Sequence, residues 1–138
     1  MGLSKVRLVE LPKVTDAGAS LTFVEGSRHL PFTIRRVYYL YDIQDGVHRG
    51  GHAHKDHEEL ILAVHGSFDV RLDDGKGSIT HHLDQPNVGI FFPTFVWHEL
   101  TNFSPGTVCL VLASHCYDHE DYFREYSEFL AAVKHKRS

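Results

Sequence analysis

The sequence predicts an all-β fold, an antiparallel barrel or sandwich that ends in one α-helix. From position 34 to 113, β-prone segments recur about every ten residues. Turn residues separate them, most clearly in the stretch Asp73-Asp74-Gly75-Lys76-Gly77, where Asp-Gly between strands is typical of a hairpin. Near the C-terminus the hydrophobic period changes from that of a strand to that of a helix. With 138 residues, the chain 1–138 has the size of a single domain.

The expected strands either alternate apolar and polar residues or carry short apolar runs rich in β-branched and aromatic residues. They cover residues 6–11, 21–25, 34–41, the stretch with His52 and His54, 60–64, 67–72, 78–83, 87–92, 96–100 and 107–113. Residues 15–20 are expected to form a turn between the first two strands. On strand 34–41, Arg36, Tyr38 and Leu40 share one face, and Tyr39 lies on the other.

The helix is expected in the last part of the chain. Its apolar residues recur at helical spacing and are Tyr122, Tyr126, Phe129, Leu130 and Val133. Asp118 is a candidate N-cap, and Lys134, Lys136 and Arg137 suit the last turn. We expect the aromatic stripe to pack against the barrel.

Composition excludes several classes of function. A net charge of −4 does not fit a general nucleic-acid binder. No run of ~18 apolar residues suggests a membrane span. Cys109 and Cys116 alone do not form a disulfide framework, and the first residues lack the apolar core of a signal peptide. We therefore expect a cytoplasmic protein with no membrane and no nucleic-acid partner.

Two histidines mark the candidate site. Because alternate residues of a strand point to the same side, His52 and His54 share a face with Cα atoms roughly 6.5 Å apart. Glu59 follows after a short turn, and His98 joins them from a distant strand if the barrel closes. Imidazoles inside a small barrel can transfer protons near neutral pH. His48 and His57 lie off this alternation and are expected to be exposed.

Three further residues complete the candidate site. Tyr38 faces inward if Arg36 and Leu40 do, and its phenol could carry a proton between positions that one imidazole cannot span. Arg36 and Arg49 suit phosphate oxygens at the mouth of the barrel. His98 is expected to line the same substrate site.

The same residues leave a metal site open. His52, His54, Glu59 and His98 would be a complete three-histidine, one-carboxylate set for Fe, Mn or Ni. From the donor atoms alone, a metal-bound site and a metal-free site are equally compatible with the sequence.

The spacing of these residues resembles a known family. Gly46-x5-His52-x-His54-x4-Glu59-x6-Gly66 resembles the first cupin motif at every fixed position. The second motif is matched at Pro93-x-Phe95-x2-His98-x3-Asn102, except that Phe95 stands where cupins usually carry glycine. The resemblance implies a cupin-type antiparallel β-barrel, or jelly roll.

Longer phrases resemble the sugar 3,4-ketoisomerases that act on dTDP-4-keto-6-deoxyglucose. These phrases cover roughly residues 5–131 and include Pro31-Phe32-x-Ile34-x-Arg36-Val37-Tyr38-Tyr39, Arg49-Gly50-x-His52-Ala53-His54-Lys55 and Asp121-Tyr122-x-Arg124-x-Tyr126-x-Glu128-Phe129-Leu130. The resemblance implies a homodimer without metal or other cofactor, working on dTDP-linked deoxysugars such as those of lipopolysaccharide O-antigen. His52 and His54 would be the catalytic pair and Tyr38 the assisting hydroxyl.

The resemblance also bears on the product. His98 occupies a position where relatives carry His or Arg, and His there is typical of enzymes that give the galacto product. Those relatives pair it with Arg in an early D-x-R-G-S-L turn, where this chain has Gly18. His98 leads us to favour the galacto product.

Three other functions remain possible. A 3,5-epimerase of the same substrate usually relies on a His–Asp pair, which the sequence alone does not locate. A metal-dependent cupin dioxygenase would use the donor set around Glu59. A non-catalytic cupin module would bind a sugar nucleotide without turning it over.

Overall fold

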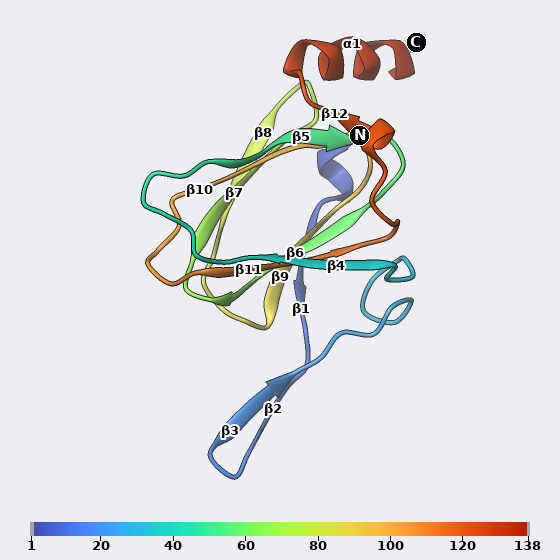
Figure 1. The fold of residues 1–138 in the computed structure, drawn as a ribbon. Coiled ribbons are helices and arrows are strands. Elements are labelled where there is room, and N and C mark those ends of the chain that lie inside the picture. Colours follow the sequence, from blue (N-terminus) through green and yellow to red (C-terminus); the bar gives the residue numbers. More distant parts are fainter. Residues whose placement is uncertain (1, 138) are drawn as a thin grey trace.

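Two five-stranded antiparallel sheets face each other and enclose the interior (Figure 1), in a computed structural model that describes residues 2–137. The first sheet has the order β1-β9-β6-β11-β4, and the second has the order β12-β5-β10-β7-β8. A short hairpin, β2-β3, forms a third sheet. The arrangement is the cupin-type barrel that the sequence predicts. No helix among the described residues is long and apolar enough to span a membrane.

The helices and strands follow one another closely. The strands are β1 (Arg7–Glu10), β2 (Lys13–Asp16), β3 (Ala19–Thr22), β4 (Arg36–Leu40), β5 (Arg49–His54), β6 (Glu59–His65), β7 (Phe68–Asp73), β8 (Ser78–Leu83), β9 (Val88–Phe92), β10 (Trp97–Thr101), β11 (Val108–Ala113) and β12 (Tyr122–Phe123). The helices are the 3-10 turns η1 (Leu3–Lys5) and η2 (His119–Asp121) and the α-helix α1 (Tyr126–Arg137).

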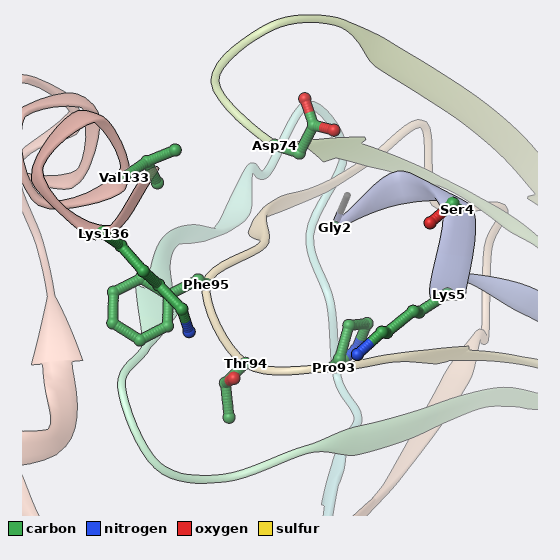
Figure 2. A pocket seen from close by; sticks show the side chains of 9 residues that line it. All are labelled: Gly2, Ser4, Lys5, Asp74, Pro93, Thr94, Phe95, Val133 and Lys136. Carbon is green, nitrogen blue, oxygen red and sulfur yellow. The ribbon is translucent and has the colours of Figure 1, made fainter. Parts of the chain in front are cut away.

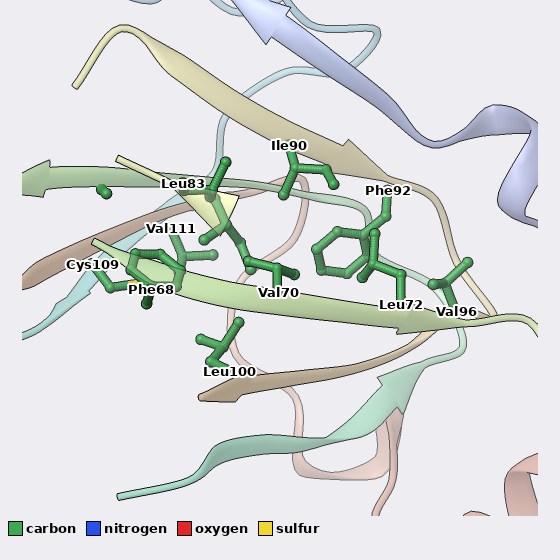
Figure 3. Close-up of a cluster of buried hydrophobic side chains, with 12 residues drawn as sticks. Phe68, Val70, Leu72, Leu83, Ile90, Phe92, Val96, Leu100, Cys109 and Val111 are labelled. Carbon is green, nitrogen blue, oxygen red and sulfur yellow. The ribbon is translucent and has the colours of Figure 1, made fainter. Parts of the chain in front are cut away.

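The hydrophobic core lies between the two sheets. Side chains of β9 and β11 meet those of β7, β8 and β10, with Phe68, Leu72 and Ile90 fully buried among them (Figure 3). A second cluster, which includes Leu30 and Phe32, covers part of the outer face of the first sheet. The apolar, β-prone sequences predicted to form strands therefore supply the buried side chains of both clusters.

The N-terminal part differs from the expectation. The sequence predicts a turn at 15–20 and a strand at 21–25, whereas the structure has the hairpin β2-β3, with Asp16 paired to Ala19. The turn residues Ala17 and Gly18 both have positive φ, 51° and 81°, which suits a two-residue hairpin turn. Figure 1 shows this hairpin as an arm that extends away from the barrel, so Gly18 lies at its tip.

The C-terminal helix begins later than expected. Asp118 caps η2 and not α1, because its carboxylate accepts a hydrogen bond from the Glu120 amide at 3.0 Å. Tyr122 was expected on the helix but lies in β12, paired with His54. The helix itself begins at Tyr126 and packs Phe129 and Val133 against Trp97, as the aromatic stripe predicts.

Phe95, at the position where cupins usually carry glycine, has a positive φ. Its φ is 60°, in the left-handed region. Its amide donates a hydrogen bond to the His54 carbonyl at 2.9 Å, and its ring packs near Phe123 and under the Lys136 ammonium. The ring contacts thus accompany a conformation that is unfavourable for a large side chain.

Candidate active site

Three imidazoles converge inside one end of the barrel. His52 lies directly opposite His98 in the β5–β10 pair, so both side chains leave the sheet on the same side. The ring centroids of His52 and His98 are 4.4 Å apart, and those of His52 and His54 are 5.0 Å apart. His54 and His98 are each only 2% exposed. The structure therefore brings together the three histidines that the sequence predicts.

A β-bulge sets the register of this cluster. Between the pairs His98–His52 and Glu99–Gly50, strand β5 contains one extra residue, Gly51. Gly50 and Gly51 have φ of 80° and 74°, and a Cβ on Gly50 would lie 2.8 Å from the His98 carbonyl oxygen. Both positions therefore require glycine, one for close approach and both for backbone conformation.

Glu59 lies at the centre of the polar cluster and is fully buried. Tyr38 donates a hydrogen bond to its Oε2 at 2.9 Å, and His57 Nε2 lies 3.2 Å from the same oxygen. The Nε2 atoms of His54 and His98 lie at 3.6 and 3.8 Å from its two oxygens. One carboxylate thus contacts the phenol and three of the imidazoles.

Tyr38 and Arg36 face the site from β4, as the alternation predicts. Tyr39, the neighbour most easily confused with Tyr38, points outward and is 59% exposed. The Arg36 guanidinium lies over the Tyr38 ring and 3.9 Å from Glu59. Its Nε and Nη2 are buried without a hydrogen-bond partner among the described residues, so they can bind an anionic or carbonyl oxygen of a ligand.

Burial keeps the imidazoles in the form that a base requires. It lowers the pKa of His52 to about 4, and it lowers the pKa of His98 well below its ordinary value. Burial also lowers the pKa of His54, although the nearby Glu59 opposes that shift. Burial alone would raise the pKa of Glu59, but the contacts of His54 and His57 hold it well below its usual range. The site thus pairs neutral imidazoles with an ionised carboxylate near neutral pH.

His57 contradicts the sequence expectation. It was expected to be exposed but is 1% exposed and lies beside His54, with ring centroids 3.4 Å apart. The alternation argument failed because residues 55–58 form a turn between β5 and β6, where two-residue periodicity does not apply. His48 is exposed, as expected.

Asp121 and Tyr122 are site residues that sequence reasoning did not assign. Asp121 Oδ2 lies 2.5 Å from His57 Nδ1 and 3.4 Å from His54 Nδ1. The Tyr122 ring is 4.6 Å from that of His54 and 5.0 Å from that of His52. The available signal was the alternation Tyr122-x-Arg124-x-Tyr126, which has the period of a strand.

Arg49 lies apart from the imidazoles. It is exposed at the opposite end of β5 from His54 and lines a groove of about 380 Å³ with Tyr39 and Tyr41. Its role in substrate binding stays a prediction. A further cavity of about 210 Å³ lies between η1 and α1, with Lys136 beside Phe95 and Lys5 on the side of Pro93 (Figure 2).

The donor atoms of the site have the spacing of a possible metal-ligand set. One nitrogen each of His52, His54 and His98 lie within 4.8 Å of one another, a spacing that an imidazole-bound divalent ion could use. Glu59 would be the fourth donor, but its Oε2 already accepts the Tyr38 hydroxyl and contacts His57. The expectation of a metal-free site without cofactors stays a prediction.

Comparison with known proteins places this fold and site in a family. The FdtA family model, described as WxcM-like, C-terminal, matches residues 4–134. A TDP-4-oxo-6-deoxy-alpha-D-glucose-3,4-oxoisomerase from Aneurinibacillus thermoaerophilus is 41% identical over 123 residues, 89% of this chain and 88% of the relative.

Solved structures agree with that match. QdtA, a sugar 3,4-ketoisomerase from Thermoanaerobacterium thermosaccharolyticum in complex with TDP, has a TM-score of 0.93 and 34% identity over 97% of this chain and 98% of its own. WlaRB, a TDP-quinovose 3,4-ketoisomerase from Campylobacter jejuni, has a TM-score of 0.88 and 38% identity over 92% and 98%.

The chain therefore belongs to the FdtA family, and its relatives are sugar-nucleotide isomerases. The resemblance to sugar 3,4-ketoisomerases, the cupin-type fold and the assignment as an isomerase are confirmed.

Acid should destabilise the fold through the buried imidazoles. His52 has its folded-state pKa near 4 and an ordinary value of 6.5, so the unfolded chain binds the proton first as pH falls. The contribution of neutral His52 to the free energy of unfolding is therefore fully present above pH ~6.5 and is lost progressively as the pH falls to ~4. Glu59, whose pKa is depressed, contributes only at still lower pH.

We expect His52→Gln to flatten this dependence by about 1–3 kcal/mol between pH 7 and pH 4.5, from urea unfolding followed by fluorescence. His82→Gln, at an exposed site, serves as the control. An unchanged slope in His52→Gln would assign the acid sensitivity to other groups.

Proposed function

We propose that this protein converts dTDP-4-keto-6-deoxyglucose into a dTDP-3-keto-6-deoxyhexose. The observation that carries the proposal is the convergence of His52, His54 and His98 with the Tyr38–Glu59 hydrogen bond in one buried site. Relatives that span nearly the whole chain support it, because they are named for this isomerisation or bind the TDP moiety.

His54 and Tyr38 have distinct roles in the proposed isomerisation. The C4 ketone acidifies the C3 proton, and neutral His54 takes that proton as general base. The resulting enediol is held by hydrogen-bond donors of the site. A proton moves from the C3 hydroxyl toward the C4 oxygen with the help of Tyr38, and C4 is then protonated. Burial raises the pKa of Tyr38, so its hydroxyl keeps its proton and acts as a donor.

Two groups are proposed to bind the substrate. Arg36 has two buried nitrogens without a hydrogen-bond partner, although one of them lies 3.9 Å from Glu59, and this arrangement suits a sugar or phosphate oxygen. Arg49 at the exposed end of β5 would contact the nucleotide portion. His98 would face the sugar ring from β10.

For the product, we favour the galacto configuration at C4. The argument rests on His98, which lies in van der Waals range of His52 inside the site and, by contacting the sugar, would select the face of C4 that is protonated. Gly18 cannot assist within the same chain, because it lies at the tip of the β2-β3 arm. The gluco product is the alternative outcome.

One observation favours the alternative function, a 3,5-epimerase. The His–Asp pair that such an enzyme would use exists here, as His57 and Asp121. Epimerisation requires exchange at C3 and C5 while the ketone stays at C4, whereas isomerisation moves the ketone to C3. The two chemistries are therefore distinguished by the position of the carbonyl.

A second copy of the chain is the proposed partner. The outer face of the first sheet exposes Val37, Tyr39, Tyr41 and Val64 by 46–62%. Such an apolar row on one face is typical of a homodimer interface. Both cysteines are free thiols, which suits the expected cytoplasmic site of action.

The reaction can be followed directly by NMR. Chelator-treated protein is incubated with dTDP-4-keto-6-deoxyglucose in deuterated buffer. We expect a 3-keto product with deuterium at C4, and the coupling constants give the configuration. Exchange at C3 and C5 with an unmoved ketone would show epimerase chemistry. Exchange restored only by added Fe or Mn would make Glu59 a metal ligand, and no exchange under any condition would indicate a binding module.

Replacing the proposed base should separate catalysis from binding. His54→Asn removes the acceptor nitrogen, so we expect isomerisation to fall by at least ~10²-fold. Affinity for dTDP, measured by calorimetry, should change by less than about threefold, because the nucleotide is held by other groups. Loss of dTDP binding or of the folded state in this variant would make His54 structural.

The homodimer can be tested at its proposed interface. Tyr39→Glu places a charge in the apolar row and should shift the sedimentation coefficient from dimer to monomer. Thr80→Glu, exposed on β8 in the other sheet, is the control and should leave the dimer intact. A monomeric wild-type protein would contradict the proposal.

A further inference from the structure

Three buried donor atoms lie together on one side of the His54 and His57 rings. Asp121 Oδ2 lies 3.4 Å from His54 Nδ1 and 2.5 Å from His57 Nδ1. The three residues are at most 3% exposed. Among residues 2–137, none of these three atoms has a hydrogen-bond partner. Buried polar atoms without a partner are rare in folded proteins, so this group is suited to a bound ion or water.

Glu59 contacts the opposite side of the same two rings. Its Oε2 lies 3.2 Å from His57 Nε2 and 3.6 Å from His54 Nε2. Burial alone would raise the pKa of Glu59, but the two imidazoles hold it well below its usual range, so the ionised carboxylate attracts a ring proton to Nε2. A neutral imidazole with its proton on Nε2 presents a lone pair at Nδ1. Metal-binding histidines are usually oriented in this way, by a carboxylate at the other ring nitrogen.

Backbone contacts direct the Asp121 carboxylate toward the imidazoles. Its Oδ1 accepts a hydrogen bond from the Asp56 amide at 2.6 Å, and its carbonyl accepts one from the Lys55 amide at 2.9 Å. Oδ2 therefore faces the two Nδ1 atoms. Lone pairs of nitrogen and an anionic oxygen repel each other, and a buried carboxylate is costly without a cation. A divalent cation bound between these three atoms would remove both costs.

A polar groove gives an ion access to this carboxylate. Asp121 lines a groove of about 720 Å³ together with Asp56, Glu58, Asp118 and Arg35. Four carboxylates against one guanidinium give the lining a negative charge, which raises the local concentration of cations. The groove would also supply a water molecule to the open coordination position that three protein ligands leave on a tetrahedral ion.

We propose that His54, His57 and Asp121 form a binding site for a divalent transition-metal ion of the zinc type. Two imidazoles and one carboxylate are a donor set that suits Zn²⁺. Ligand atoms of a tetrahedral zinc ion lie about 3.3 Å apart. The separation of Asp121 Oδ2 from His54 Nδ1, 3.4 Å, already has this value. Its separation from His57 Nδ1 would have to open by about 0.8 Å on binding.

The proposed site differs from the donor set of the cupin motif. The cupin set would combine His54 with His52, His98 and Glu59, and the Nε2 atoms of His54 and His98 face that carboxylate. The proposed ion binds the other ring nitrogen of His54. An ion on Nδ1 keeps the ring proton on Nε2, so His54 could not accept a proton from a substrate there. If the proposed isomerase function holds, Zn²⁺ should therefore inhibit the reaction, and a chelator should restore it.

Metal binding can be measured without substrate. Chelator-treated protein is titrated with Zn²⁺ by calorimetry and with Co²⁺ by visible absorption, and we expect one ion per chain. His57→Gln and Asp121→Asn should each weaken binding at least ~10-fold, because even outer partners of a metal contribute that much. His98→Gln removes a ligand of the cupin set only and should bind zinc as the wild type does. His82→Gln, in the exposed pair with Asp69, is the surface control.

Two results would overturn the site. One is a wild-type protein that binds no zinc. The other is loss of the ion in His98→Gln with retention in His57→Gln and Asp121→Asn, which would assign the ion to the cupin set. Circular dichroism verifies that each variant is folded. Zinc bound to the wild type without inhibition of an active enzyme would exclude His54 as a ligand, whereas zinc binding by a protein that forms no 3-keto product would contradict the isomerase function and leave the metal site supported.

A measurement on the wild type alone covers the case in which a variant does not fold. In ¹⁵N-histidine-labelled protein, zinc should shift the Nδ1 resonances of two histidines and leave their Nε2 atoms protonated. Zinc-dependent shifts at the Nε2 atoms of three histidines would instead place the ion in the cupin set and overturn the proposal.

Discussion

The buried carboxylate of Glu59 is the constraint on which the rest of the site depends. A buried carboxylate is costly unless donors and cations surround it. Here those groups come from four places in the chain: Tyr38 and Arg36 on β4, His54 on β5, His57 in the following turn and His98 on β10. Glu59 therefore gains its partners only when the barrel closes and brings these segments together. The positions of the active-site side chains thus follow from the need of the folded chain to compensate this buried carboxylate.

The two sheets contribute different groups to the active site. The first sheet supplies Glu59 and Tyr38, whereas the second supplies the imidazoles that would meet the substrate. Between them, the apolar cluster around Phe68 and Ile90 fixes the distance between the layers. Neutral imidazoles result from burial in this layer, and an ionised carboxylate results from the contacts that cross it. Proton transfer at neutral pH needs both conditions together.

Sequence patterns predicted the fold and the main site because they depend on local periodicity. Alternation placed Tyr38 inward and His52 beside His54, and motif spacing added His98. The failures lie where periodicity does not apply. His57 lies in a turn, and the position of a turn residue depends on contacts such as that with Asp121, 64 residues later. Tyr122 was read with the helical spacing that follows it, although only two residues pair with β5 there. Such pairings are tertiary and leave little trace in local composition.

The bulge at Gly50 and Gly51 has a consequence for how this chain tolerates change in length. Because side chains alternate along a strand, removing Gly51 from the bulge would shift His52, Ala53 and His54 by one position, so both imidazoles would turn to the side of Trp97 and Phe129 and Ala53 would face the site. The preceding loop, by contrast, can absorb an insertion without disturbing any paired strand. Homologous chains should therefore vary in length before Arg49 and keep a constant count from Gly50 to His54. Counting residues across that short stretch would be a more discriminating guide to shared chemistry than overall identity.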